Sequence, residues 1–279
     1  MLKEQHPDLA DLEIREVVGG WDNQMWRLGE ELAVRVPRTE RAPDLLRLEY
    51  RWLPELAGRL PLPTPVPLRL GEPSERFPKP WVVAAWVPGE PADRAEISRG
   101  AHGAEVLAGF LRALHVAAPI GAPVNSERGV STGANFDTLL GAEFVAESGI
   151  AAGIREVWED ALAATDWDGP PVWLHGDLHP ANVVVRDGTL AGVVDFGELG
   201  AGDPATDVAA AWIVLPAGAA GRFFEVYEVD AATVRRARGW AIRCACVLIA
   251  IGKAGERGLR GGKPTWLPAG RRALENLLA

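Results

Sequence analysis

The chain has few cysteines and no long apolar run. Its 279 residues include only Cys244 and Cys246, which stand close together in an apolar stretch without metal-ligand residues nearby. A pair so placed is poorly suited to a structural disulfide, and we expect a reducing, cytoplasmic setting. No run approaches the ~18 apolar residues of a membrane span, and the N-terminal residues lack the basic-then-apolar pattern of a signal peptide. We therefore expect no membrane partner.

Basic residues are also scarce. The chain has 29 basic against 38 acidic residues, for a net charge of −9. Nucleic-acid binding needs a basic surface facing phosphate, so we expect no nucleic-acid partner. The negative charge could attract a cationic substrate, although ordinary solubility explains it more simply. Only four of the basic residues are lysines: Lys3, Lys79, Lys253 and Lys263.

Residues 1–88 have the pattern of a small β-rich lobe. The chain is 48% hydrophobic, which is enough for one large domain or for two lobes. Alternating apolar positions predict strands, and the leucine spacing after residue 42 predicts one helix. Pro88 and Gly89 break the last strand, and we place the boundary between the lobes there. The expected elements are strands over 12–18, 25–28, 32–36 and 81–87 and a helix over 42–60.

Residues 89–279 have the pattern of a larger, mostly helical lobe. Apolar residues recur at every third and fourth position over 102–119, which is typical of an amphipathic helix. We expect a loop over 120–134, further helices to about 165, strands over 171–197 and mostly helix beyond. The predicted fold class is α+β with two lobes. Ligands favour the cleft between two such lobes.

The densest chemical signal is a predicted hairpin that ends in two oxygen ligands. Two apolar runs flank Asp187-Gly188, a dipeptide that favours a type I′ two-residue turn. Pairing the runs across this turn sets Asn182 opposite Val193 and leaves Asp195 at the open end. An amide oxygen and a carboxylate thirteen residues apart thus meet. Paired hard oxygen donors are how Mg²⁺ is usually held, with phosphate oxygens and water completing its shell.

A carboxylate precedes this pair on a short loop. Asp177 comes five residues before Asn182, and Gly176 and Pro180 keep the loop from becoming a helix. A carboxylate beside the metal could accept or orient the proton of an attacking hydroxyl.

These motifs resemble a known family. The string HGDLHPAN followed by VVDFG resembles the catalytic and metal-binding loops of aminoglycoside phosphotransferases and their relatives, the small-molecule branch of the protein-kinase superfamily. It is also similar to the HRDxxxxN and DFG pair of protein kinases, but Gly176 in place of arginine and the trailing GAGDPATD favour the small-molecule branch. The resemblance runs from about Gly19 to Trp212 and more weakly to the C-terminus. It implies a protein-kinase-like bilobal fold, with a nucleotide-binding lobe of residues 1–88 and a catalytic and acceptor-binding lobe of residues 89–279.

The resemblance also implies roles for the loop residues. It makes Asp177 the catalytic base or hydroxyl orienter, and Asn182 and Asp195 the Mg²⁺ ligands. His175 would be structural and would pin the catalytic loop from the cleft side. Asp207 would hold the same loop through backbone hydrogen bonds.

Two segments of the N-terminal lobe carry the resemblance to a nucleotide site. The string VVGGWDNQMWRL resembles the loop that covers the nucleotide phosphates. Gly19 and Gly20 would let the backbone approach closely, so that N–H groups contact phosphate oxygens. A simple turn between strands is the alternative. The adenine would lie against the hinge strand, near Ala85 to Val87.

The chain departs from the family where a lysine is expected. The family usually places a lysine on the strand after the glycine loop, but LAVRVPR puts Arg35 there, with Glu49 as its helix partner. No lysine occurs between Lys3 and Lys79, so none can substitute locally. Arginine can bridge phosphate and carboxylate, but its reach and shape differ from those of lysine. This departure leaves open a non-catalytic nucleotide-binding module.

Several other residues have ordinary explanations. His175 and His179 have the spacing of a zinc pair on a helix, but a proline follows at once. We expect His115 to be a packing or capping residue. Glu198 could face a cationic substrate or simply solvent. The eleven tryptophans favour core packing over an aromatic cage, as for Trp52, Trp173 and Trp240.

We therefore expect a Mg²⁺-dependent phosphotransferase that moves the γ-phosphoryl of ATP or GTP to a hydroxyl of a small molecule. An aminoglycoside-type antibiotic is the first candidate acceptor; a macrolide, a sugar or a choline-like metabolite is the alternative. No APE-type activation segment follows the DFG string, which disfavours a protein kinase. No GxSxG elbow supports a hydrolase.

Overall fold

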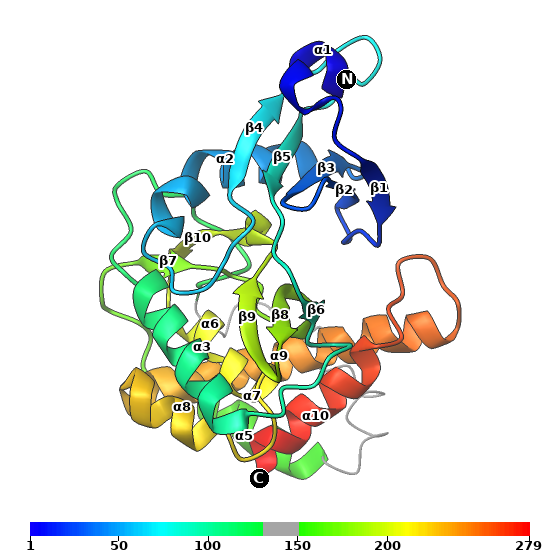
Figure 1. Cartoon of the computed structure of the whole chain (residues 1–279). Coiled ribbons are helices and arrows are strands. Elements are labelled where there is room, and N and C mark those ends of the chain that lie inside the picture. Colours follow the sequence, from blue (N-terminus) through cyan, green and yellow to red (C-terminus); the bar gives the residue numbers. More distant parts are fainter. Residues whose placement is uncertain (131–150) are drawn as a thin grey trace.

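The computed structural model describes residues 1–130 and 151–279. The N-terminal lobe lies at the top of Figure 1 and the C-terminal lobe lies below it. The helical segments predicted between residues 135 and 150 lie outside the described residues. In the described ranges, no helix is both long enough and apolar enough to cross a membrane.

An antiparallel sheet of five strands forms the N-terminal lobe, in the order β1-β2-β3-β5-β4. Helix α2 packs beside it and buries one face that carries Leu46, Glu49 and Leu53. This face brings a carboxylate to the inner side of the sheet. The elements of the lobe are α1 (Leu2–Gln5), η1 (Pro7–Leu9), β1 (Ile14–Val17), β2 (Asn23–Leu28), β3 (Leu32–Pro37), α2 (Ala42–Ala57), β4 (Pro67–Gly71) and β5 (Trp81–Ala85).

Three predicted elements of the N-terminal lobe are shorter in the structure. Strand β1 lies at an edge of the sheet, where its first three side chains are exposed. Helix α2 ends at Ala57 rather than at residue 60, because the following prolines cannot continue it. Strand β5 ends at Ala85 rather than at residue 87, because Pro88 has no N–H to offer a neighbouring strand.

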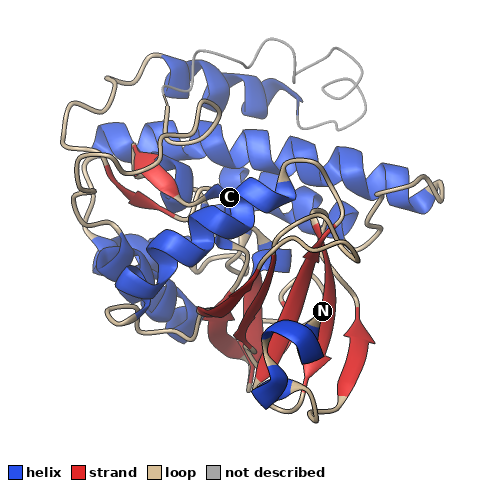
Figure 2. Ribbon diagram, turned by 90° about the horizontal axis from the view of Figure 1, so that it is seen from above, coloured by secondary structure: helices blue, strands red, loops and turns tan. Residues whose placement is uncertain are grey.

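The C-terminal lobe is built around the long helix α9 (Ala231–Glu256). Its first turn is capped by Asp230, whose side chain accepts the Thr233 N–H at 2.9 Å. Buried alanines such as Ala241 and Ala245 allow neighbouring helices to pack closely against it. Seen from above, most helices gather to one side of the strands (Figure 2). The other helices are α3 (Gly100–Leu114), α5 (Ala151–Leu162), η3 (Pro180–Asn182), η4 (Phe196–Glu198), α6 (Ala205–Val208), α7 (Ala210–Ile213), α8 (Ala220–Tyr227) and α10 (Trp266–Leu278).

Two small sheets lie between these helices and the cleft. The first is β6 (Glu90–Pro91), β8 (Val183–Arg186) and β9 (Thr189–Val193), and the second is β7 (Val172–Leu174) and β10 (Gly200–Gly202). The turn between β8 and β9 has positive φ at both Asp187 and Gly188, as a type I′ turn requires. Because β6 pairs with β8 directly after Gly89, the chain joins the C-terminal lobe at once. This supports a boundary at residue 88, which stays a prediction.

One predicted pairing in the hairpin is wrong. The sequence predicts Asn182 opposite Val193, but Val183 takes that place in the structure. The prediction assumes an unbroken ladder, whereas a bulge adds one residue to β9 and moves the later pairs by one. The Asn182 carbonyl oxygen instead accepts the Val194 N–H at 2.9 Å, which still brings Asn182 beside Asp195.

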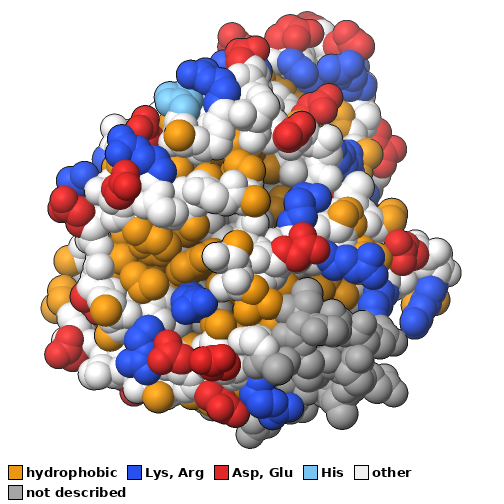
Figure 3. Space-filling view, turned by 90° about the horizontal axis from the view of Figure 1, so that it is seen from below, with side chains coloured by type: hydrophobic (Ala, Val, Ile, Leu, Met, Phe, Trp, Pro, Cys, Tyr) orange, Lys and Arg blue, Asp and Glu red, His pale blue; other side chains and the backbone are white. Residues whose placement is uncertain are grey.

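Charged side chains of both signs are mixed on the underside of the molecule. On the face in Figure 3, acidic and basic groups alternate around apolar areas, and among the coloured residues no basic stripe gathers there. This face does not have the electrostatic pattern that nucleic-acid binding needs.

A buried ion pair fixes α9 to the segment after β10. Arg236 donates from Nε and Nη2 to the two carboxylate oxygens of Asp203, at 2.7 and 3.1 Å. A third donor, Nη1, reaches the Thr165 carbonyl oxygen at 2.6 Å. Both side chains are at most 6% exposed. Each of the two buried charges is thus stabilised by the other in place of water.

Replacing Arg236 with methionine should destabilise the protein by about 3–5 kcal/mol, because it leaves the Asp203 carboxylate buried without its charge partner. Urea unfolding measures this. The matched control is Arg235→Met, which breaks only the exposed pair with Asp160 and should cost about 0–1 kcal/mol. Equal losses in the two variants would contradict the importance of the buried pair.

Candidate active site

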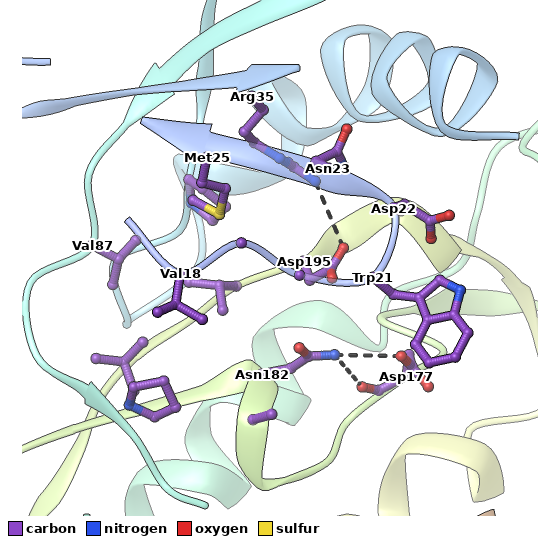
Figure 4. Close-up of a pocket in the computed structure, with 18 of the residues that line it drawn as sticks. Val18, Trp21, Asp22, Asn23, Met25, Arg35, Val87, Asp177, Asn182 and Asp195 are labelled. Carbon is purple, nitrogen blue, oxygen red and sulfur yellow. Dashed lines mark hydrogen bonds and ion pairs between the residues drawn. The ribbon is translucent and has the colours of Figure 1, made fainter. Parts of the chain in front are cut away.

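A cleft between the lobes collects most of the residues predicted from the sequence. Figure 4 shows its centre, where Arg35 and Asp195 face each other and Asn182 lies beside Asp177. Three of the predicted residues, Glu49, His175 and Asp207, do not line this cavity. Those that line it are Gly19, Gly20, Arg35, Ala85, Val87, Asp177, Asn182 and Asp195.

The loop that carries Asp177 is held from behind by Asp207. The Asp207 carboxylate is fully buried and accepts the backbone N–H groups of His175 and Gly176, at 2.7 and 2.9 Å. Gly176 has φ +81°, in the left-handed region, and a Cβ there would stand 2.6 Å from the Glu198 carbonyl oxygen. The tight turn therefore requires glycine, and it projects Asp177 towards the cleft.

A second contact to Asp207 comes from a histidine on α3. His115 Nε2 lies 3.2 Å from Asp207 Oδ2, and its Nδ1 is hydrogen-bonded to the Tyr227 hydroxyl. The neutral ring can donate to Asp207 and accept from Tyr227 at once. Burial, with Asp207 and Asp203 nearby, raises the pKa of Tyr227 above its usual range, so the phenol keeps its proton. His115 thus packs in the core and also supports the loop.

His175 links the catalytic loop to the segment before Asp195. Its Nδ1 accepts the Asp177 N–H at 3.2 Å, so the ring hydrogen is on Nε2 and donates to the Val194 carbonyl oxygen at 3.0 Å. The ring also packs against Phe196, with centroids 4.6 Å apart. These contacts fix the loop that carries Asp177 relative to the segment that carries Asp195.

Asn182 and Asp195 present oxygen atoms to the same part of the cavity. The Asn182 Nδ2 donates to the Asp177 carbonyl oxygen at 2.9 Å, so the amide oxygen is turned away from that loop. In Figure 4 it points to the side on which Asp195 lies. Asp195 has φ +64°, a strained conformation for a residue with a side chain, and its carboxylate is about half exposed to the cleft. The donor set of one amide and one carboxylate oxygen fits Mg²⁺.

The Asp177 carboxylate is ionised in this setting. Its Oδ2 lies 3.4 Å from His179 Nε2, and its Oδ1 lies 3.4 Å from Arg128 Nη2. Burial alone would raise the pKa of Asp177, but His179 and then Arg128 outweigh it and hold that pKa well below its usual range. The group can accept a hydrogen bond from a hydroxyl. Nothing in the motif signals Arg128, because it comes from the segment after α3 rather than from the segment that carries Asp177.

Arg35 is locked to Glu49. Both terminal nitrogens of Arg35 bond the two Glu49 oxygens, one of them at 2.9 Å, and Nη2 also lies 3.7 Å from Asp195 Oδ1. Burial alone would lower the pKa of Arg35, but Glu49 and then Asp195 outweigh it and raise that pKa. The guanidinium is therefore a permanent cation, and a bidentate pair fixes its plane.

The segment between β1 and β2, residues 18–22, is the glycine loop, and it lies close to Asp195. A Cβ at Gly19 would stand 2.5 Å from the Asn23 carbonyl oxygen, so only glycine fits there. A Cβ at Gly20 would stand 3.7 Å from Asp195 Oδ2, which shows how near the loop backbone is to that carboxylate. Backbone N–H groups at this place could contact a phosphate.

Glu198 lines the cavity but is not a free solvent-exposed carboxylate, so the solvent interpretation is wrong. Its carboxylate is 17% exposed and bonds Arg41 Nη1 at 2.8 Å and Asn125 Nδ2 at 2.6 Å. Arg41 also bonds Asp22 in the glycine loop, at 2.7 Å. The sequence interpretation misses this contact because its members are far apart in the chain.

The hinge offers one backbone donor to a ligand. The Ala85 N–H is already donated to the Val66 carbonyl oxygen at 2.9 Å, and the Trp86 N–H to that of Glu31 at 2.7 Å. The Val87 N–H forms no hydrogen bond with another residue in the described part of the chain, and Val87 lines the cavity.

Replacing Gly176 with alanine should destabilise the protein by about 2 kcal/mol or more, because the left-handed backbone would carry a Cβ. Turnover should fall as well, since Asp177 is the next residue. Thermal unfolding and phosphoryl-transfer assays measure the two effects. Gly109→Ala on α3 is the control: its Cβ meets nothing within 4 Å, and it should stabilise the helix by about 0.5–1 kcal/mol. A Gly176→Ala variant as stable as the wild type would contradict the strain.

Comparisons with known proteins show the family of the chain. The sequence model of the phosphotransferase enzyme family matches residues 13–241. An aminoglycoside 3'-phosphotransferase of Escherichia coli is 25% identical over 197 residues, which cover 67% of this chain and 69% of the relative. One of Salmonella typhimurium is 26% identical over 161 residues, covering 54% of this chain and 59% of the relative.

Solved structures share the fold over nearly the whole chain. The complex of APH(2")-IIia with GDP and kanamycin has a TM-score of 0.67 at 20% identity, and covers 99% of this chain and 96% of that one. The macrolide 2'-phosphotransferase MphH of Brachybacterium faecium has a TM-score of 0.63 at 23% identity, and covers 93% of each chain. The predicted α+β bilobal fold is confirmed. With more than half of its length matched, the chain belongs to the phosphotransferase enzyme family.

Proposed function

We propose that this protein transfers the γ-phosphoryl group of ATP or GTP to a hydroxyl of a small molecule and that it needs Mg²⁺ to do so. One observation carries the proposal: Asp177, Asn182 and Asp195 converge on one cavity beneath the glycine loop. Phosphoryl transfer needs all three side chains in one place, because the metal ligands and the group that orients the hydroxyl act on the same phosphoryl group. A module that only binds nucleotide has no need of the ionised Asp177.

The N-terminal side of the cavity would hold the nucleotide. The Val87 N–H is available for the base, and the backbone at Gly19 and Gly20 would cover the phosphates. Arg35, held by Glu49, would place its fixed positive charge near them.

The oxygens of Asn182 and Asp195 would hold the Mg²⁺ ion, with phosphate oxygens and water as its other ligands. When bound, the ion supplies positive charge that neutralises the transferring phosphoryl group. The strained backbone at Asp195 is consistent with a side chain that the fold must aim at a ligand.

Asp177 would orient the acceptor hydroxyl and accept its proton as the phosphoryl group moves. Its carboxylate is ionised and lies at the lower edge of the cavity (Figure 4). Catalysis of this kind depends on position, and Asp207, His175 and Gly176 supply that position.

The two free thiols on α9 also lead us to infer a reducing, cytoplasmic location.

For the acceptor, we propose an aminoglycoside-type compound first, supported by the aminoglycoside 3'-phosphotransferase relatives. A macrolide is the second candidate, and Arg128 favours it. The Arg128 guanidinium lies 3.4 Å from Asp177, so positive charge already occupies the place where a polycation would have to approach. A sugar or a choline-like metabolite is the further alternative.

The Asp177→Asn variant should fold and bind nucleotide but lose turnover by about 10²–10⁴-fold, because the amide cannot take up the proton. The assay is ADP and GDP release with Mg²⁺ and ATP or GTP, across aminoglycosides, macrolides, sugars and choline. The control is Asp187→Asn in the exposed β8–β9 turn, which should keep full activity. Full activity in Asp177→Asn would refute the assignment. Nucleotide binding with no transfer to any acceptor class would favour the binding module.

Chelation of divalent cations should abolish transfer, and Asp195→Asn should raise the Mg²⁺ concentration for half-maximal rate by about tenfold or more, because the ligand loses its charge. A Mg²⁺ titration of the steady-state rate measures the shift, again with Asp187→Asn as control. Transfer that persists in chelator would exclude the proposed metal site.

A further inference from the structure

The loop between α9 and α10, residues 257–265, and the first residue of α10 contact the proposed nucleotide cleft at three places. In Figure 1 it forms the orange end of the C-terminal helices, on the same side as β1 and β2. A Cβ at Gly261 would stand 2.9 Å from the Trp21 ring, so the indole of the glycine loop rests against the backbone here. Thr265 Oγ1 donates to Asp93 Oδ2 at 2.6 Å. Trp266 packs on His179, with ring centroids 4.7 Å apart.

The loop has a defined conformation of its own. The Gly262 N–H bonds the Leu259 carbonyl oxygen at 3.0 Å, and the Lys263 N–H bonds that of Ile251 at 3.2 Å. A Cβ at Gly255 would stand 2.5 Å from the Pro264 nitrogen, so the two sides of the loop touch. The position of Lys263 is therefore fixed by backbone contacts.

Lys263 lies between the contacts that mark the phosphate end of the cleft. It comes two residues after Gly261, which touches the glycine loop, and three before Trp266, which touches the catalytic loop. Lys263 lines the same cavity as Asp177 and Asp195. A phosphate chain bound beneath the glycine loop would be close to a cation at this place.

The other cations of the cavity are engaged or exposed. Arg35 is bound to Glu49, and Arg41 bonds two carboxylates. Arg94 is exposed to solvent, whereas Lys263 is half-buried. Within the described ranges, Lys263 has no ion pair or side-chain hydrogen bond. Five carboxylates line the cavity against four Lys and Arg side chains. A polyphosphate therefore needs each cation that is not already neutralised. The carboxylates are Asp22, Asp93, Asp177, Asp195 and Glu198, and the cations are Arg35, Arg41, Arg94 and Lys263.

We propose that Lys263 binds the phosphate chain of the nucleotide from the C-terminal side of the cleft. It thus provides the lysine contact that the N-terminal lobe lacks, where Arg35 stands on the strand. This inference rests on the proposed function of the cleft as a nucleotide site. The ammonium group would donate to phosphate oxygens as a charge-assisted hydrogen bond.

The test compares ADP and GDP, each with Mg²⁺, against adenosine and guanosine, by calorimetry on the whole chain. Lys263→Met should weaken diphosphate binding by about tenfold or more, and should leave nucleoside affinity unchanged because a nucleoside has no phosphate. Lys263→Arg keeps the charge and should restore most of the affinity. The matched control is Arg260→Met, on the exposed part of the same loop, which should change neither affinity.

Each outcome decides. Unchanged diphosphate affinity in Lys263→Met would overturn the inference while leaving the proposed function intact. A parallel loss of nucleoside affinity would also overturn it, because it would show a structural role for the side chain. Absence of diphosphate and nucleoside binding by the wild type would refute the nucleotide site itself, and the inference with it.

Discussion

The Asp207 carboxylate accepts two consecutive backbone N–H groups, and the geometry of the active site follows from that contact. It is fully buried, so its charge needs several donors at once. The donors that meet this need are the N–H groups of His175 and Gly176 and the ring of His115. Because two of them belong to the catalytic loop, the loop cannot move without exposing a buried charge. This constraint fixes the position of Asp177, the next residue in the loop.

The cleft has a second constraint, which is charge. Three carboxylates at its centre and edges are paired with arginines, through Arg35 at Asp195, Arg41 at Glu198 and Arg128 at Asp177. Arg35 and Arg41 come from the N-terminal lobe, and Arg128 comes from the segment after α3. These pairs limit the repulsion among the carboxylates. The lining of the cleft still has one more carboxylate than Lys and Arg side chains, five against four.

The sequence carried the local features of this site and missed the long-range ones. The turn at Asp187-Gly188 and the glycine loop are set by neighbouring residues, so their chemistry can be predicted from the string. The bulge in β9 has no such signal, so the predicted pairing of Asn182 with Val193 is wrong by one residue. Arg128 and Arg41 are placed by tertiary packing, and loop composition does not reveal what an arginine will reach. The pair between Arg41 and Glu198 has no local signal for the same reason.

The scarcity of lysine connects these points. An N-terminal-lobe lysine could leave its carboxylate partner to reach phosphate, because its ammonium is a flexible point charge. Arg35 makes a bidentate pair with Glu49 in which both terminal nitrogens are used and the plane is fixed. This pair holds the guanidinium rigidly, so a lysine on another wall, whose backbone is fixed but whose side chain is flexible, would complement it. Lys263 is on a loop that touches the glycine loop and the segment after the hinge, and Trp266, just beyond that loop, packs on His179. Arg35 near one end of the chain and Lys263 near the other thus line the same cavity.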